Sequence, residues 1–237
     1  MQIKNSVAFV TGANRGLGAQ IVKALQDHGA RKIYAASRNG KSELQGVLSV
    51  ALDITNPDQV RMVADSVPDV TLLINNAGVN QMAKLISPNN DFDAQVEMDV
   101  NYFGTLRMCR TFAPIIAANG GGTIVNIASI AGRVNIPIMG SLSASKAAVV
   151  SLTQGIRAEL DRQKINAILV MPGVIDTEMS RFVPPPKADP ALVAQRIVEA
   201  IEAGSEELYP DDMAQFMAHG LSADPKAVEK QVAAFGF

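Results

Sequence analysis

The sequence predicts an α/β fold: a single domain with a doubly wound parallel sheet of the Rossmann type. Two observations carry this prediction. Short apolar segments alternate with helical patterns along the chain, and a glycine-rich turn follows the first apolar segment. The chain has 237 residues, of which 48% are hydrophobic, so it can bury one sizeable core. We therefore expect one domain over residues 1–237, in which residues 179–237 form a substrate loop and a C-terminal tail.

The predicted elements follow one another in strand–helix–strand order. Strand 7–10 leads into a helix with apolar positions at Ile21, Val22 and Leu25, and a second strand spans 33–36. Further strands are predicted at 47–52, 70–74, 123–128 and 165–171, with a short edge strand at 208–210; further helices begin at Asn56-Pro57 or span 92–118, 143–162 and 191–203. Right-handed crossovers cover both faces of such a sheet, and its ligands bind beyond the carboxyl ends of the strands.

The glycine-rich turn at residues 11–18 is the most informative motif of the chain. It reads Thr-Gly-Ala-Asn-Arg-Gly-Leu-Gly, with Gly12, Gly16 and Gly18 where the backbone must bend tightly or approach a ligand. The helix that follows offers free N–H groups and a partial positive charge, which favour a pyrophosphate at its start. Tight strand-to-helix turns also need glycine for structural reasons, but the βαβ context favours a dinucleotide.

Composition and charge exclude several classes of function. A net charge of −2 with scattered lysines and arginines leaves no basic stripe for nucleic acid. No apolar run reaches about 18 residues and no signal-peptide pattern opens the chain, so we expect a soluble, cytoplasmic protein with no membrane partner. The single cysteine, Cys109, permits no internal disulfide and fits a buried structural thiol. His28 and His219 are too isolated to indicate a metal site.

Short motifs after the predicted strands resemble those of the short-chain dehydrogenase/reductase family over residues 3–210. Besides the glycine-rich turn, they are Asp53, Asn75-Asn76-Ala77-Gly78, Asp99-Val100-Asn101, Ser129, Ser143-Ala144-Ser145-Lys146, and Pro172-Gly173 with Thr177. The resemblance implies a nicotinamide cofactor with Asp53 and Ile54 at its adenine and Asn76 on its adenosine side. It further implies Lys146 at the nicotinamide ribose, and Ile175 with Thr177 at the carboxamide. The implied cofactor residues are together Gly12, Asn14, Arg15, Gly16, Leu17, Gly18, Arg38, Asp53, Ile54, Asn76, Ala77, Gly78, Lys146, Pro172, Gly173, Ile175 and Thr177.

Charge around the second predicted strand indicates which nicotinamide cofactor binds. Members of the family that prefer NAD are expected to carry an acidic residue there, which accepts hydrogen bonds from the ribose 2′-hydroxyl. Here the strand is followed by Ser37 and Arg38, with no carboxylate. Arg15 in the glycine-rich turn and Arg38 can converge on a 2′-phosphate with charge-assisted hydrogen bonds, whereas a structural interpretation makes both of them solvated loop residues. The sequence therefore favours NADPH.

The chain departs from the family pattern at the catalytic centre. By resemblance, a tyrosine four residues before the lysine gives a proton to the carbonyl oxygen of the substrate, and the lysine lowers the pKa of that tyrosine. Position 142 is leucine here, while Ser129, Lys146 and Asn101 are retained. General acid catalysis contributes about 10²–10⁴-fold in rate, so ordinary ketone reduction should be badly impaired.

No other side chain replaces the acid convincingly. Tyr102 follows Asn101, but successive helix residues point about 100° apart, so it is expected to face away from the ligand. Tyr34 and Tyr209 lie on other elements. The serines that flank position 142 are poor acids and are common as helix caps; they are Ser141, Ser143 and Ser145.

Three interpretations stay open. The chain is a carbonyl reductase by descent that Leu142 disables or redirects. Alternatively, it transfers hydride to an iminium ion, which needs little acid help because its own charge activates it. In the third interpretation it is a non-redox enzyme or an NADP(H)-binding sensor, in which Lys146 holds the ribose and Ser129 merely caps a turn. The resemblance also implies a small-molecule substrate and a homo-oligomer, either a dimer or a tetramer.

The signal fades after residue 178. The segment 179–186 ends in three prolines and is interpreted as a loop over the active site, with a stiff surface connector as the alternative. Helical spacing of Met213, Phe216, Met217 and Leu221 predicts a tail that covers the substrate pocket, an oligomer face or simply part of the core.

Overall fold

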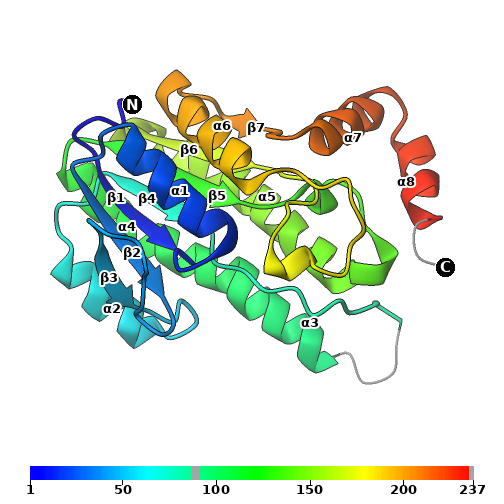
Figure 1. The fold of residues 1–237 in the computed structure, drawn as a ribbon, viewed down its shortest axis with the longest axis horizontal. Helices are drawn as coiled ribbons and strands as arrows, with labels where there is room; N and C mark the ends of the chain where they lie inside the picture. Colours follow the sequence, from blue (N-terminus) through cyan, green and yellow to red (C-terminus); the bar gives the residue numbers. More distant parts are fainter. Residues whose placement is uncertain (87–90, 235–237) are drawn as a thin grey trace.

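Seven parallel strands form one twisted sheet in the order β3-β2-β1-β4-β5-β6-β7 (Figure 1). This is the architecture of a computed structural model that describes residues 1–86 and 91–234. The strands are β1 (Val7–Thr11), β2 (Lys32–Ser37), β3 (Leu48–Ala51), β4 (Leu72–Asn75), β5 (Gly122–Ile127), β6 (Ile165–Val170) and β7 (Glu207–Leu208). The strand order reverses between β1 and β4, where a doubly wound sheet opens a crevice for ligands. The predicted fold class is confirmed.

Helices cover both faces of the sheet. On one face α1 (Gly16–Asp27) and α6 (Pro190–Ala203) lie side by side (Figure 1). On the other face are α2 (Pro57–Ser66), α4 (Thr105–Ala118) and α5 (Gly140–Leu160). Strand β1 shows how the two cores arise: Ala8 and Val10 pack toward α1 and α6, whereas Val7 and Phe9 pack toward α2 and α4. Alternate residues of a buried parallel strand point to opposite faces, so its sequence is apolar throughout.

The predicted continuous α-helix 92–118 is wrong in its middle. The chain forms α3 (Asp91–Glu97), then a π-helix, η1 (Met98–Gly104), and only then α4. A π turn is wider than an α turn, and the carbonyl of Asn101 accepts a hydrogen bond from the Thr105 hydroxyl at 2.7 Å. Hydrophobic periodicity does not separate the two helix types, because both leave one apolar stripe toward the core.

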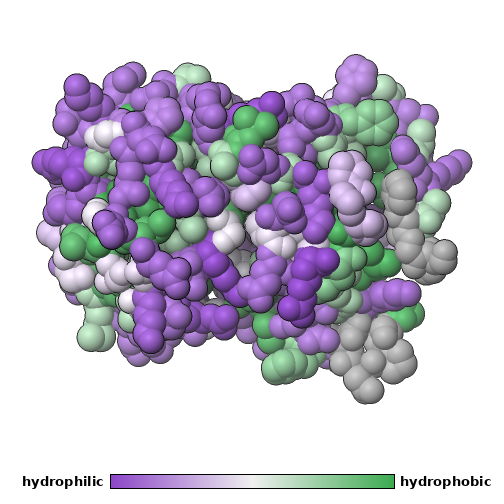
Figure 2. Space-filling model, in the orientation of Figure 1, coloured by the Kyte–Doolittle hydropathy of each residue, from purple (hydrophilic) through white to green (hydrophobic). Residues whose placement is uncertain are grey.

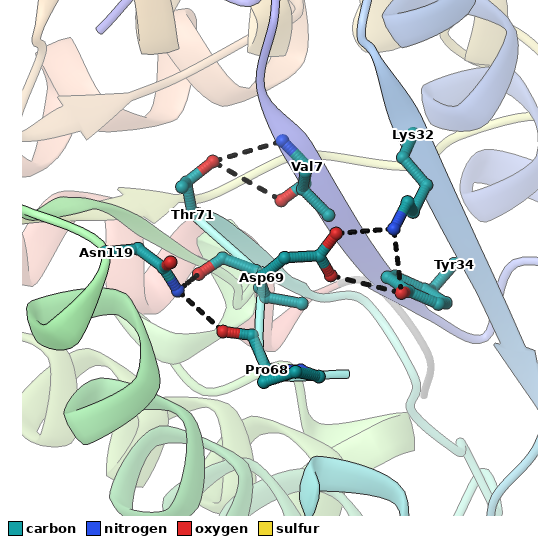
Figure 3. Close-up of polar contacts among 8 residues, drawn as sticks. Val7, Lys32, Tyr34, Pro68, Asp69, Thr71 and Asn119 are labelled. Carbon is teal, nitrogen blue, oxygen red and sulfur yellow. Dashed lines mark hydrogen bonds and ion pairs between the residues drawn. The ribbon is translucent and has the colours of Figure 1, made fainter. Parts of the chain in front are cut away.

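The amino ends of the strands are fastened by polar contacts around the segment before β4 (Figure 3). Asp69 is paired with Lys32 and accepts a hydrogen bond from the Tyr34 hydroxyl at 3.1 Å. The Thr71 hydroxyl accepts the Val7 N–H at 3.1 Å, and the Asn119 side chain donates to the backbone carbonyls of this segment. Tyr34 is thus engaged at the edge of the sheet opposite to the carboxyl ends of the strands.

The C-terminal tail forms two further helices, α7 (Asp212–Ala223) and α8 (Pro225–Ala233). Val134, Val228 and Val232 make a small buried cluster, against which Met217 and Leu221 pack. Met213 and Phe216, by contrast, are exposed on α7. Hydrophilic residues cover most of the face seen in Figure 2, with apolar residues among them near α7. Residues 235–237 of the predicted tail lie outside the described residues.

Short 3₁₀ helices complete the described chain; they are η2 (Ile130–Gly132), η3 (Pro137–Met139), η4 (Asp161–Gln163) and η5 (Glu178–Ser180). In the part of the chain that the structure describes, no helix is both long and apolar enough to cross a membrane.

Two glycines provide a test of how tightly the sheet is packed. A Cβ at Gly122 would lie 2.0 Å from the Thr71 backbone oxygen, whereas one at Gly155 would meet open space. We expect Gly122→Ala to destabilise the fold by about 1–3 kcal/mol through overpacking. Gly155→Ala, the matched control in an exposed part of α5, is expected to stabilise it by up to about 1 kcal/mol. Urea titrations measure both, and equal effects of the two substitutions would contradict this account.

Candidate functional site

The carboxyl ends of β1 and β4 meet at the glycine-rich turn. Gly12 and Gly16 have φ of +64° and +54°, in the left-handed region that favours glycine. A Cβ at Gly18 would lie 2.1 Å from the Gly12 carbonyl oxygen, so a larger residue does not fit there. The N-cap residue of α1, Arg15, makes no side-chain hydrogen bond to the first turn, which also carries no acidic residue. The first N–H groups of α1 are therefore available to an anion.

Thr11 and Asn76 tie the glycine-rich turn to the end of β4. The Asn76 side-chain amide donates to the backbone oxygens of Thr11 at 3.0 Å and Gly12 at 3.1 Å. In return the Thr11 hydroxyl accepts the N–H groups of Asn76 and Ala77, both at 3.0 Å. These bonds hold the turn beside the segment after β4, so both loops line one rim.

The predicted adenine end lies after β3. One carboxylate oxygen of Asp53 accepts hydrogen bonds from the N–H and the hydroxyl of Thr55, at 2.9 and 2.7 Å. Ile54 is buried, and its carbonyl accepts a hydrogen bond from Arg107 on α4 at 2.6 Å. Helix α4 thus positions the two residues that sequence reasoning placed at the adenine.

The structure does not bring Arg15 and Arg38 together. Arg15 forms an ion pair with Glu178 of η5, and both side chains are largely exposed. Arg38 is exposed just beyond β2, and Asn14 is exposed beside Arg15. Neither arginine is buried, so each is free to rotate toward a ligand. The predicted convergence on a phosphate stays a prediction.

The loop after β6 closes the other side of the rim. The Gly173 N–H donates to the Asp211 carboxylate at 2.8 Å, which ties the loop to the start of α7. Thr177 caps η5, and its methyl carbon would lie 3.4 Å from a Cβ at Gly16. Ile175 forms an isolated bridge with Ala188. The predicted residues 172–177 therefore lie against the glycine-rich turn.

Lys146 of α5 lies at the centre of the rim. Its ammonium group donates to the Ile127 carbonyl at the end of β5, at 2.8 Å. The Nζ atom also lies 3.5 Å from where a Cβ of Gly78 would be. Desolvation of the ammonium group lowers the pKa of Lys146 to about 8, and the negative charge of Glu97 opposes that shift.

Asn101 of η1 connects three segments around Lys146. Its side-chain oxygen accepts the Val79 N–H at 2.9 Å, and its amide donates to the Val79 carbonyl at 3.0 Å. The same amide donates to the Ser145 hydroxyl at 2.9 Å. A Cβ at Gly78 would lie 3.1 Å from the Asn101 oxygen. Asn101, Lys146 and the segment after β4 therefore form one contiguous group.

Ser129 stands at the end of β5 with structural partners on both sides. Its hydroxyl accepts the Ala131 N–H at 3.1 Å, which caps η2, and donates to the Pro172 carbonyl at 3.3 Å. The residue is partly exposed, and the contact with Pro172 joins the loops after β5 and β6.

Leu142 lies in the first turns of α5 with 7% of its surface exposed. The neighbouring serine hydroxyls all have protein partners. Ser141 donates to Glu97 at 2.5 Å, Ser143 donates to the Met139 carbonyl, and Ser145 donates to the Leu142 carbonyl. These hydroxyls are engaged in holding α5, which agrees with the prediction that none replaces an acid.

The tyrosines are equally engaged elsewhere. The Tyr209 hydroxyl accepts a hydrogen bond from Arg133 at 2.7 Å, and burial raises its pKa. Tyr102 packs edge-on against Phe103, with ring centres 4.9 Å apart. Tyr34 is bound to Asp69 at the far edge of the sheet. None of these contacts involves Leu142 or Lys146.

Sequence reasoning missed Glu97 and Asp211. Glu97 is fully buried four residues before Asn101, and this helical spacing is the signal that places both near one face. Asp211 precedes the apolar pattern of α7, where an N-cap is expected, and its carboxylate indeed accepts the Ala214 N–H at 2.9 Å. Its second role, holding Gly173, depends on tertiary contact and leaves no trace in the sequence.

The described residues contain no group of three or more His, Cys, Asp or Glu side chains that could hold a metal ion. Burial raises the pKa of the Cys109 thiol to about 12, so this cysteine is an unreactive thiol of the core.

Comparison with known proteins agrees with this geometry. The family model described as short chain dehydrogenase matches residues 6–188. The chain belongs to this family. A solved structure of a short chain dehydrogenase from Burkholderia cenocepacia J2315, in complex with NADP, is 48% identical, with a TM-score of 0.94 over 98% of this chain and 99% of that one.

Curated relatives are more distant. An uncharacterized oxidoreductase of Staphylococcus aureus is 31% identical over 216 residues, which cover 84% of this chain and 92% of that protein. The dehydrogenase/reductase SDR family member 7B of Bos taurus is 28% identical over 197 residues, or 75% of this chain. The match spans 60% of the length of that relative.

Replacing Lys146 by methionine is expected to stabilise the ligand-free protein at pH 7. The pKa of Lys146 is about 8 in the folded protein, against 10.5 for an ordinary lysine, so the charged folded state is disfavoured below pH 8 by up to about 3 kcal/mol. Between pH 8 and 10.5 the unfolded chain binds more protons, so the stability of the wild type rises and the advantage of Lys146→Met shrinks. Urea titrations across this range test the sign, and a pH-independent difference would contradict it.

Proposed function

We propose that the chain is an NADP(H)-dependent oxidoreductase of the short-chain dehydrogenase/reductase type, a carbonyl reductase by descent that Leu142 impairs or redirects. The observation that carries the proposal is the grouping of Lys146, Asn101 and Ser129 at the carboxyl rim, with an apolar Leu142 one helical turn before Lys146. Its substrate is a small molecule. A homo-oligomer and a cytoplasmic location stay predictions from the family resemblance and the composition.

The rim fits a nicotinamide dinucleotide. The positive φ of Gly12 and Gly16 and the close approach of Gly18 to Gly12 leave a cradle that side chains would fill. The uncapped start of α1 adds N–H donors for a pyrophosphate. Asp53 and Ile54 would hold the adenine, Lys146 the nicotinamide ribose, and Ile175 with Thr177 the carboxamide. The bound cofactor supplies or accepts a hydride.

The phosphorylated form of the cofactor is favoured by charge. No carboxylate follows β2, and Arg38 is exposed there. Arg15 lies at the start of α1, within rotation of the same side of the rim once it leaves Glu178. A homologous structure with 48% identity was solved with NADP, which supports the same cofactor here. Guanidinium groups bind phosphate through directional, charge-assisted hydrogen bonds.

The residues of the catalytic frame have separate tasks. Lys146 would bind the ribose hydroxyls and place positive charge beside the reacting centre. Asn101 holds the segment after β4 against Lys146. The Ser129 hydroxyl would hold the substrate oxygen if it releases Pro172. Leu142 supplies apolar surface and no proton, so the hydride acceptor must obtain its proton elsewhere or need none.

We expect NADPH to bind more tightly than NADH, because Arg15 and Arg38 meet a 2′-phosphate and no carboxylate repels it. Cofactor fluorescence titration measures both affinities. The Arg15→Ala, Arg38→Ala double variant should lose most of the preference, and equal affinities in the wild type would refute the assignment.

A matched control isolates the role of the Arg15–Glu178 ion pair. Glu178→Gln keeps the shape of that side chain and frees Arg15, so NADPH should bind about 2–5-fold more tightly, the range that an exposed ion pair can withhold. The change should vanish in the Arg15→Ala background. A similar gain in that background would assign the effect to simple loss of negative charge near the cofactor.

Leu142→Tyr tests whether only the acid is absent. If so, reduction of a panel of ketones with NADPH should rise by about 10²–10⁴-fold, the range of general acid catalysis. Leu142→Phe is the control, because it adds the ring without the hydroxyl and should give no such gain. No gain with Leu142→Tyr on any panel member would indicate a pocket shaped for other work.

An iminium reductase is the second candidate, favoured by the buried, apolar Leu142 beside Lys146. A preformed cation accepts hydride without simultaneous protonation, so it does not require the absent acid. Lys146 opposes this role by repelling a cationic substrate. Including a cyclic imine and its ketone analogue in the same panel separates the candidates: a higher kcat/KM for the imine in the wild type favours the iminium reductase. Cofactor binding without turnover of any panel member, in the wild type or in Leu142→Tyr, indicates an NADP(H)-binding sensor or a non-redox enzyme.

A further inference from the structure

A fully buried carboxylate lies behind the catalytic frame. Glu97, the last residue of α3, has none of its surface exposed. One of its oxygens accepts the Gln81 N–H at 2.6 Å, and the other accepts the Ser141 hydroxyl at 2.5 Å. Burying an ionised carboxylate is expensive unless hydrogen bonds and a nearby charge offset the desolvation. None of the roles assigned above uses this group, so its presence calls for a reason.

Glu97 and Asn101 make parallel sets of contacts. Glu97 binds the segment after β4 at Gln81 and helix α5 at Ser141. Asn101, four residues later, binds the same segment at Val79 and the same helix at Ser145. The two residues thus hold the segment 79–81 and the first turns of α5 together, on either side of the position where Gly78 meets Lys146 Nζ.

The charge of Glu97 also acts on Lys146. Desolvation lowers the pKa of that lysine, and Glu97 is the charged group that opposes the shift. Other titratable side chains stand on α5 or on elements packed against it: Asp91 and Asp93 on α3, Asp99 and Tyr102 on η1, Arg107, Cys109 and Arg110 on α4, Arg133 after η2, Arg157 and Glu159 on α5, and Asp161 and Arg162 on η4. None of these contributes to the pKa of Lys146.

We propose that Glu97 is a positioning residue of the site, which holds the segment after β4 against α5 and serves as the buried counter-charge that keeps Lys146 an ammonium ion. Two properties of this residue have separate consequences. The hydrogen bonds set geometry, and a neutral amide of the same shape preserves most of them. The negative charge sets the protonation of Lys146, and the amide removes it. The inference rests on the proposed role of Lys146, but its test does not depend on turnover.

The test follows the titration of the Lys146 amine by NMR, through its 13Cε shift, assigned with Lys146→Met. The wild-type midpoint is expected near 8. In Glu97→Gln the midpoint should fall by about one unit, at the lower end of the effect of a nearby opposite charge. Ser141→Ala is the matched control, because it removes a hydrogen-bond partner and keeps the charge. Its midpoint should stay within ~0.3 units of the wild type, well below the shift of a lost charge.

NADPH affinity gives a second readout. Glu97→Gln should bind NADPH several-fold more weakly than the wild type at pH 7.5, where its Lys146 is largely neutral, and should recover at pH 6. An equal midpoint in Glu97→Gln and the wild type would overturn the proposal, as would an equal shift in Ser141→Ala. If NADPH binds to neither protein, the proposed function fails while the Lys146 midpoints still decide the role of Glu97.

The pair can also be approached from its other member if Glu97→Gln does not fold. In Lys146→Met the 13Cδ titration of Glu97 should move to higher pH, because the carboxylate loses the nearby positive charge. Coupling between two groups is reciprocal, so the shift should again be about one unit. An unmoved Glu97 midpoint in that variant would overturn the proposal.

Discussion

The whole rim depends on the position of one short segment, residues 76–81, between the end of β4 and the helices that follow. Thr11 and Asn76 bind its start to the glycine-rich turn. Asn101 and Glu97 bind its continuation to η1 and α3. Since the strand order reverses beside β4, this segment lies where a doubly wound sheet binds its ligand. Gly78 is required there because Asn101 and Lys146 approach its backbone closely.

The site is held by bonds that favour function over stability. Lys146 is desolvated beneath this segment, which lowers its pKa and costs the ligand-free fold free energy at neutral pH. The π turn around Asn101 widens the helix where its side chain serves three segments. The apolar cores on both faces supply the rigidity that holds these groups in place, because the strands between them are buried throughout.

The retained frame and the apolar Leu142 together narrow the chemistry. A site that kept only nucleotide binding would have no need for a buried counter-charge behind Lys146, whereas a site that handles charge in the reacting group benefits from it. The serines and tyrosines are engaged as structural donors or acceptors, so the proton question rests on the substrate and on Leu142. The ion pair of Arg15 with Glu178 adds a contact between the two loops that flank the proposed cofactor.

The sequence by itself determined the strand and helix order, the glycine-rich turn and the rim positions, because hydrophobic periodicity and turn glycines are local properties. It missed the π register of residues 98–104, since an α and a π turn present the same apolar stripe. It also missed Glu97 and Asp211 and did not foresee Glu178 as the partner of Arg15. Only the tertiary structure decided those pairings: Glu97 and Ser141 stand 44 residues apart, and Arg15 and Glu178 stand 163 apart. A polar side chain takes the partner that folding brings within reach, and no local pattern records which one that is.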